Sequence, residues 1–262
     1  MNLSLDGKTA LVSGSTQGIG KATAHELAKM GARVLLLARN EDKLKEVVNE
    51  LNTINSAGHD YIVADFSKPE EVKIAVEKAL EKYKIVNILI NNTGGPPAGK
   101  AIDADVNAFK TAFDMHLICN HIITGLVVGG MKSSGYGRIV NVISTSVKQP
   151  LPNLGVSNTI RGAVANWSKT LSIELGPFGI TVNNVLPGAT ATGRLDSIAE
   201  RKASQTGKSV AEVLTDMGKA APLQRVAQPN EVANGICFLA SPAASYINGI
   251  NLPVDGGRTG SL

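Results

Sequence analysis

A glycine-rich stretch near the N-terminus has residue types and a spacing that suit phosphate binding. Gly14, Gly18 and Gly20 follow a short apolar run and open a helical pattern. In a strand-to-helix turn of this kind, glycine lets the backbone approach a pyrophosphate closely, and the first N–H groups of the helix point at the anion. The turn therefore indicates nucleotide binding, although spaced glycines alone also occur in ordinary tight turns.

The end of the second expected strand bears on which dinucleotide binds. Folds that bind NAD usually carry Asp or Glu there, because a carboxylate bonds the ribose 2′-hydroxyl. This chain has Ala38 and Arg39 instead. A guanidinium can bind a 2′-phosphate bidentately and no carboxylate repels it, so we predict NADP(H) as the cofactor. The alternative is that Arg39 is a solvated residue at the start of the next helix.

Further motifs follow the glycine turn in order along the chain. They are Asp65-Phe66 after the third expected strand, Asn91-Asn92-Thr93-Gly94 after the fourth, Asn183 with Pro187-Gly188, and Asp255-Gly256-Gly257. With the GxxxGxG spacing of the turn, they resemble the motifs of the short-chain dehydrogenase/reductase family. The chain length, Gly137–Asn141 and Tyr246–Gly249 are similar to those of 3-oxoacyl-acyl-carrier-protein reductases within that family.

The resemblance implies which residues hold the cofactor. It gives the glycine turn to the pyrophosphate, the acid after the third strand to the adenine, and the position of Arg161 to the nicotinamide ribose. The residues expected to bind NADP(H) are Gly14, Ser15, Thr16, Gln17, Gly18, Ile19, Gly20, Arg39, Asp65, Phe66, Asn92, Thr93, Gly94, Arg161, Pro187, Gly188, Thr190 and Thr192.

The catalytic residues that the resemblance implies are altered in this chain. Most members of the family carry a Tyr-x-x-x-Lys pair, a Ser about thirteen residues before the Tyr, and an Asn on an earlier helix. The alignment places the serine role on Ser144, but Ser157 and Arg161 stand where Tyr and Lys are expected, and His116 stands in place of Asn. No shift restores the pair, because none of the four tyrosines, Tyr61, Tyr83, Tyr136 and Tyr246, has Lys four residues later.

These substitutions remove the usual proton relay. A serine hydroxyl and an arginine guanidinium do not exchange a proton near neutral pH as a phenol and an ammonium do. General acid catalysis commonly contributes about 10²–10⁴ in rate, so we expect weaker catalysis. Arg161 can still hold a positive charge near the substrate oxygen, while Ser144 and Ser157 donate hydrogen bonds to it. His116 and Lys148 are alternative proton donors, although a packed histidine and a surface lysine are the commoner situations.

Composition and charge exclude several classes of function. The 262 residues are 43% apolar and 18% charged with a net charge of +4, and no run of like charges forms a basic arm, so we expect no nucleic-acid partner. Cys119 and Cys237 match no metal-ligand or disulfide pattern, and we predict no metal site. The first residues lack a signal-peptide pattern and the uncharged stretch Met115–Met131 is short for a membrane span, so we expect a soluble cytoplasmic protein without a membrane partner.

Short apolar runs alternate with helical patterns along the chain, which predicts an α/β fold. We expect a single doubly wound Rossmann domain over residues 1–262, with a seven-stranded parallel sheet and helices on both faces. The polar helical stretch at about 193–228 breaks the alternation, and we expect it to form a lid over the ligand. The expected strands are Thr9–Val12, Val34–Leu37, Tyr61–Ala64, Ile88–Ile90, Ile139–Ile143, Thr181–Val185 and Ile250–Val254, and the expected helices include Gly20–Met30, Glu41–Asn55, Pro69–Tyr83 and Arg161–Glu174.

Three functions are consistent with these features. We predict an NADP(H)-dependent oxidoreductase that reduces a carbonyl, either a 3-oxoacyl thioester or another small ketone, with an atypical active site. A dinucleotide-binding protein with little redox activity, acting as a sensor or in assembly, is the first alternative, and non-redox chemistry in the same cleft is the second. The resemblance also implies a homotetramer, in which Met115–Met131 and Arg161–Glu174 lie on the helices that pair between subunits.

Overall fold

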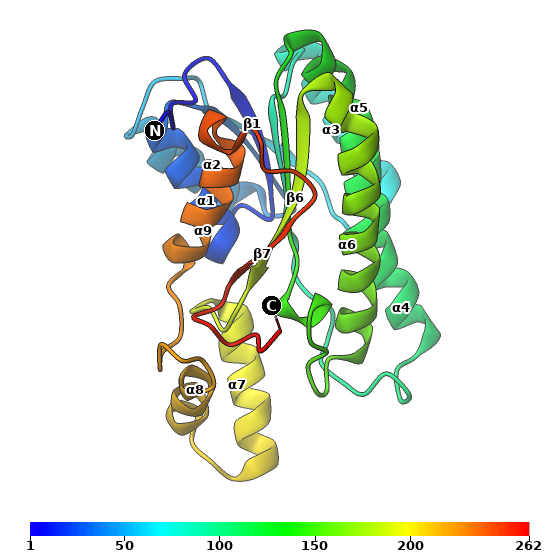
Figure 1. The fold of residues 1–262 in the computed structure, drawn as a ribbon, viewed down its shortest axis with the longest axis vertical. Helices are drawn as coiled ribbons and strands as arrows, with labels where there is room; N and C mark the ends of the chain where they lie inside the picture. The colour runs from blue at the N-terminus through cyan, green and yellow to red at the C-terminus, as the bar shows by residue number, and fades with distance from the viewer. Residues whose placement is uncertain (262) are drawn as a thin grey trace.

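Seven parallel strands form one sheet at the centre of the fold (Figure 1). The computed structural model describes residues 1–261; Leu262, the last residue of the predicted domain, lies outside the described residues. The sheet order is β3-β2-β1-β4-β5-β6-β7, so the direction of winding reverses between β1 and β4, where doubly wound folds bind their ligands. The strands are β1 (Thr9–Ser13), β2 (Arg33–Ala38), β3 (Asp60–Val63), β4 (Ile88–Asn91), β5 (Gly137–Val142), β6 (Ile180–Pro187) and β7 (Asn251–Val254).

Helices cover both faces of the sheet (Figure 1). Val34 and Leu36 of β2 pack in one apolar core and Leu35 and Leu37 in the other, because successive strand residues point to opposite faces. The central strands are therefore covered on both faces, which explains why they read as largely apolar runs. One face carries α1 (Gly18–Lys29), α2 (Glu41–Asn52) and α9 (Pro229–Ala240); the other carries α3 (Pro69–Tyr83), α4 (Val106–Phe113), α5 (Cys119–Ser134) and α6 (Gly155–Leu175).

The predicted α/β fold with a seven-stranded parallel sheet is confirmed, with corrections at the ends of the elements. Helix α6 begins at Gly155 and not, as predicted, at Arg161. Ser157 therefore lies in the first turn of a helix, one turn before Arg161. The residue after Asn52 is Thr53, whose hydroxyl donates to the carbonyl of Glu50, and there α2 ends earlier than expected.

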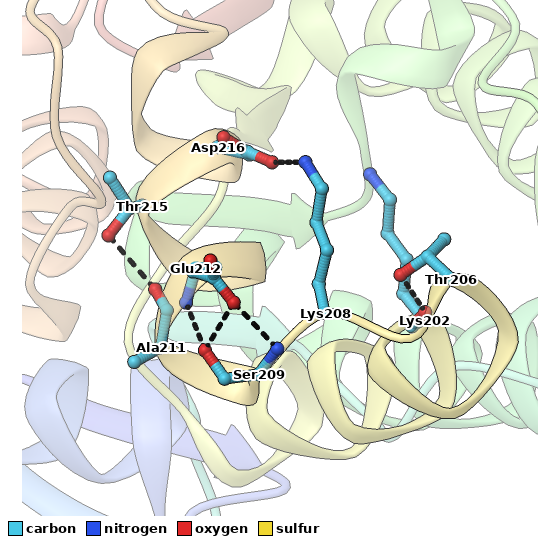
Figure 2. A network of polar contacts seen from close by, with 8 residues as sticks. All are labelled: Lys202, Thr206, Lys208, Ser209, Ala211, Glu212, Thr215 and Asp216. Carbon is cyan, nitrogen blue, oxygen red and sulfur yellow. Dashed lines mark hydrogen bonds and ion pairs between the residues drawn. The ribbon is translucent and has the colours of Figure 1, made fainter.

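The stretch predicted as an insertion contains two helices, α7 (Gly193–Thr206) and α8 (Val210–Lys219), which lie beyond the carboxyl end of β6 and pack against each other (Figure 1). Figure 2 shows how the chain turns between them. The Ser209 hydroxyl accepts a hydrogen bond from the Glu212 backbone N–H, and the Glu212 carboxylate accepts one from the Ser209 N–H, which forms a capping box. An ion pair of 2.6 Å joins Lys208 to Asp216 across the turn.

Four asparagines lie side by side across β4, β5, β6 and β7. Asn91 is in register with Asn141, Asn141 with Asn184, and Asn184 with Asn251. Each Nδ2 donates to the Oδ1 of the next residue, over 2.8, 3.0 and 2.8 Å in that order. These four residues, which we call the asparagine row, join the four strands through side chains in addition to the backbone ladder.

One long helical segment, Val106–Ser134, is apolar and long enough by composition and length to cross a membrane. It comprises α4, a single π-helical turn at Asp114–Ile118 and α5. Within the fold it packs against α3 and α6 on one face of the sheet. The segment is therefore part of the helical layer that covers this face of the sheet.

Candidate functional site

The glycine turn is held in shape by one side chain from the next strand of the sheet. Gly14 has a φ of +59°, a left-handed conformation that favours glycine. Nδ2 of Asn92, which directly follows β4, donates to the carbonyls of Ser13 and Gly14 at 3.2 Å each. A Cβ atom on Gly20 would overlap the Gly14 carbonyl. The first and third glycines of the turn are thus required for close packing, and Asn92 acts as their clamp.

The N-terminus of α1 fits a bound phosphate. Gln17 precedes the helix without capping it through its side chain, and the first turn contains no acidic residue. The first N–H groups of the helix are therefore left for an anion. Among residues 1–261, the buried hydroxyls of Ser13 and Ser15 also lack a hydrogen-bond partner. Thr192 lies on the other side of this turn, because a Cβ on Gly18 would stand 3.0 Å from its methyl carbon.

The residues expected at the adenosine end lie at the carboxyl ends of β2 and β3. Arg39 directly follows β2 and is exposed, so its guanidinium is free to meet a ligand. The Asp65 carboxylate accepts from the Ser67 backbone N–H at 2.9 Å. That bond, with the positive charges of Arg39 and Lys68, lowers the pKa of Asp65. The Phe66 side chain is buried in the apolar core.

The segment after β6 closes the other side of the nucleotide turn. Gly188 donates its N–H to the Val254 carbonyl at 2.9 Å, and a Cβ on this glycine would stand 2.7 Å from the Asp255 Cα. Glycine is therefore the residue that fits between β6 and the C-terminal turn. Thr190 is buried and donates to the Gly188 carbonyl, and Thr192 donates to the Thr190 carbonyl. These bonds place Thr192 against the glycine turn at the start of α7.

Arg161 is fixed at the carboxyl end of β5, close to Ser144. Its Nη1 donates to the Val142 carbonyl at 2.9 Å, and Val142 is the last residue of β5. Ser144 follows two residues later, where its hydroxyl accepts from the Ser146 N–H and caps a short 3₁₀ turn. Ser157 is partly buried and lies one turn before Arg161 on α6. The structure thus places Ser144 and Arg161 at one strand end, and Ser157 beside Arg161.

The Arg161 side chain is only 8% exposed and carries no ion pair with residues 1–261. Burial and, to a smaller extent, the positive charge of Arg194 together lower the pKa of this guanidinium to about 10. At neutral pH the group therefore remains a cation. A buried charge without a counter-charge is costly, which marks this position as a functional candidate.

His116 lies in the π-helical turn between α4 and α5 and is 1% exposed. Burial lowers its pKa well below the usual 6.5, and the nearby Arg161 adds to this effect, while a hydrogen bond with the Gly94 backbone opposes it. The imidazole is therefore neutral at pH 7. The single chain already buries His116, so no subunit contact is needed to explain its burial, whereas His121 is exposed and packs edge-on against Trp167.

Two further arginines, which we did not predict as site residues, contact the loop after the Asn-Asn-Thr-Gly motif. Nη2 of Arg194 donates to the Pro96 carbonyl at 2.5 Å, and Nη1 of Arg201 donates to the Ala98 carbonyl at 2.7 Å. Both lie on α7, seven residues apart, and thus on one face of the helix. That spacing within a polar insertion was the available sequence signal.

The described residues contain no cluster of three or more His, Cys, Asp or Glu side chains that could hold a metal ion. Both cysteines are buried, and burial raises the pKa of the Cys119 thiol to about 12. Neither thiol is therefore a candidate nucleophile at neutral pH.

Comparison with known proteins extends over nearly the whole chain. Residues 14–259 match the family described as Enoyl-(Acyl carrier protein) reductase. The chain is 32% identical over 251 residues to the short-chain reductase protein NovJ of Streptomyces niveus. The aligned region covers 95% of this chain and 93% of that protein.

Solved structures of reductases also match nearly the whole chain. The L-sorbose reductase of Gluconobacter frateurii, determined in complex with NADPH and L-sorbose, superposes with a TM-score of 0.94 at 30% identity over 100% of both chains. A variant of actinorhodin polyketide ketoreductase determined with NADPH has a TM-score of 0.91 and 32% identity, over 97% of this chain and 98% of that one.

Proposed function

Because the chain belongs to the short-chain dehydrogenase/reductase family, we propose that it is an NADP(H)-dependent oxidoreductase that reduces the carbonyl of a small ketone or a 3-oxoacyl compound at a substituted active site. The observation that carries the proposal is the fixed cation Arg161, held by the Val142 carbonyl at the end of β5, two strands away from an intact nucleotide turn. The similarity to a polyketide ketoreductase supports the 3-oxoacyl class.

The residues of the nucleotide turn suit NADP(H). The uncapped N-terminus of α1 would hold the pyrophosphate, and the clamp formed by Asn92 keeps the turn open for it. Arg39 would bind the 2′-phosphate, which NAD(H) lacks. The neighbouring structures determined with NADPH support this choice. NADPH held by these residues would supply the hydride that reduces the carbonyl carbon, and a proton taken up by the carbonyl oxygen would complete the alcohol.

The chain's own groups then act by binding and charge. Ser144 and Ser157 would donate hydrogen bonds to the carbonyl oxygen, which orients the carbonyl carbon for the hydride. Arg161 would contact the nicotinamide ribose, and its positive charge would stabilise the negative charge that develops on the oxygen. His116 is neutral at pH 7 and is positioned to hold the Gly94 backbone, so solvent is the proposed source of the proton. Helices α7 and α8 would cover the bound ligands as a lid.

The absence of a Tyr-x-x-x-Lys pair favours one alternative, a dinucleotide-binding protein with little redox turnover. The reductase and the dinucleotide-binding protein are distinguished by measuring NADPH binding and NADPH oxidation separately. NADPH binding is followed by fluorescence titration, and NADPH oxidation is followed with simple ketones, 3-oxoacyl thioesters and activated dicarbonyls. We expect binding together with measurable oxidation for at least one class. If NADPH binds tightly but none of these classes of compound oxidises it, the protein is a dinucleotide-binding protein and not a reductase.

A further inference from the structure

Two arginines from different helices approach Gly95. Arg161 comes from α6 and Arg194 from α7, and a Cβ on Gly95 would stand 3.9 Å from Nη2 of the former and 3.7 Å from Nη2 of the latter. Gly95 itself follows the Asn-Asn-Thr-Gly motif at the end of β4. We call Arg161 and Arg194 the arginine pair.

No carboxylate balances the arginine pair. Within residues 1–261, no Asp or Glu oxygen lies within 4.0 Å of either guanidinium, although Arg225, on the surface, pairs with Glu231 at 2.6 Å. Each member of the pair donates to one backbone carbonyl, Arg161 to Val142 and Arg194 to Pro96. A guanidinium has five N–H donors, so both groups retain donors for a ligand. Arg161 is buried and Arg194 is partly buried, so the approach of their like charges is unfavourable, and a bound anion would relieve it.

The cofactor does not supply this anion in the proposed arrangement. Its pyrophosphate is assigned to the N-terminus of α1 and its 2′-phosphate to Arg39, while the group assigned to Arg161 is a ribose, whose hydroxyls are neutral. The arginine pair is therefore available to bind an anionic group of the substrate.

Resting on the proposed function, we propose that the arginine pair binds a carboxylate of the substrate, so that the preferred substrate is an oxo acid and not a neutral ketone. Arg194 is the specificity-determining residue of the pair, because it makes no proposed contact with the cofactor. A planar guanidinium matches the two oxygens of a carboxylate. The carboxylate would also draw the ketone toward Ser144, beside which Arg161 is fixed.

Matched pairs of compounds test this proposal. 2-Oxobutanoate and 4-oxopentanoate are each compared with their methyl esters, which keep the ketone and lose the charge. We expect kcat/KM to be at least about 30-fold higher for one of the acids than for its ester, since loss of one partner of a buried charge pair commonly has an effect of this size. Equal or higher values for both esters would overturn the proposal.

Variants separate recognition of the substrate from docking of the lid. Arg194→Gln keeps an N–H donor for the Pro96 carbonyl and removes the charge. We expect it to lower kcat/KM for the acid by about 30-fold or more, mainly through KM, to change the ester less than about threefold, and to leave NADPH affinity unchanged. Arg201→Gln is the matched control, since Arg201 is an exposed cation on the same face of α7 that also bonds a loop carbonyl. An equal loss in both variants, or an equal loss for acid and ester, would make Arg194 a docking residue only.

A binding measurement keeps this inference separate from the proposed function. Butyrate and butyramide, which have no ketone to reduce, are titrated into the NADP⁺ complex by calorimetry. Tighter binding of butyrate in the wild type, lost in Arg194→Gln and kept in Arg201→Gln, supports the carboxylate site even if no ketone is reduced. If butyrate binds no better than butyramide while ketones are reduced, the reductase stands and the carboxylate site is wrong.

Discussion

The Arg161 guanidinium donates to the carbonyl of Val142 at 2.9 Å, and this bond ties the start of α6 to the end of β5. It fixes a permanent cation where the family resemblance leads one to expect a lysine ammonium. The bond also explains why Arg161 is buried and yet keeps a polar partner.

The double variant Ser157→Tyr, Arg161→Lys is expected to raise the rate of carbonyl reduction at least about tenfold. The phenol supplies the missing general acid, which commonly contributes about 10²–10⁴ in rate, and the lysine holds it in place. Ser157→Tyr alone is expected to gain less, because a guanidinium does not replace a compact ammonium beneath the phenol. Single-turnover measurement of NADPH oxidation follows the effect. A double variant that folds and binds NADPH but reduces no ketone would contradict the reductase.

NADPH is expected to bind at least about tenfold more tightly than NADH. A charge-assisted hydrogen bond contributes about 1.5–3 kcal/mol, and Arg39 would make one to the 2′-phosphate. Arg39→Asp reverses the order, because a carboxylate repels the phosphate and bonds the ribose 2′-hydroxyl. Fluorescence titration with both nucleotides measures this. Lys43→Gln, a loss of charge one turn along α2, serves as the control and leaves the preference unchanged.

His116 is expected to make the free energy of unfolding depend on pH below about 6.5. Its folded pKa is depressed, so below its ordinary value of 6.5 the unfolded chain binds a proton that the folded chain does not. The unfolding free energy therefore falls as the pH falls, by up to about 1.4 kcal/mol per pH unit from this group.

His116→Gln removes that contribution, and its stability curve between pH 7 and pH 5 is expected to be flatter than that of the wild type. Urea unfolding at several pH values measures the difference. Burial also lowers the pKa of His59, so the wild type itself shows more than one contribution. The contribution of His116 is therefore the difference between the stability curves of the wild type and of His116→Gln. His121→Gln, at an exposed site, is expected to follow the wild type. Parallel curves for His116→Gln and the wild type would contradict a buried neutral imidazole.

A homotetramer is expected at micromolar concentration. The surface of α6 exposes Ile173, with 69% of its surface accessible in the single chain, and Phe178 lies exposed just beyond the same helix. Exposed large apolar side chains on a helix suit burial against another subunit. Light scattering gives the mass, and Ile173→Glu is expected to shift it to a smaller species. A wild-type monomer would rule out this assembly.

The fold was largely predictable because its signals are local. The central strands are covered on both faces, so most strands appear as short, largely apolar runs, and the helices between them follow regular patterns. The start of α6 was missed because Gly155 and Asn158 have low helix propensity, and tertiary packing extends the helix through them.

The site was only partly predictable. Arg161 and Ser144 were identified because the resemblance fixes their places along the chain, and the structure puts both at the end of β5. Arg194 was missed, because its importance depends on α7 folding back onto the loop that contains Gly95, almost one hundred residues earlier. A single sequence does not carry that long-range contact. The burial of His116 likewise depends on the packing of its π-helical turn against α6.

The asparagine row has a consequence for how the chain avoids misfolding. In the row every amide donates in the same direction, from Asn91 toward Asn251, and the four residues meet only when β4, β5, β6 and β7 are all in the native alignment. A slip of one residue in β5 or β7 would turn Asn141 or Asn251 to the opposite face of the sheet, because both are flanked by apolar residues, and would leave the amides of their neighbours buried without partners. The apolar runs alone would tolerate such a slip, since both faces are apolar. The row therefore disfavours shifts in the register of these strands that hydrophobic burial alone would accept.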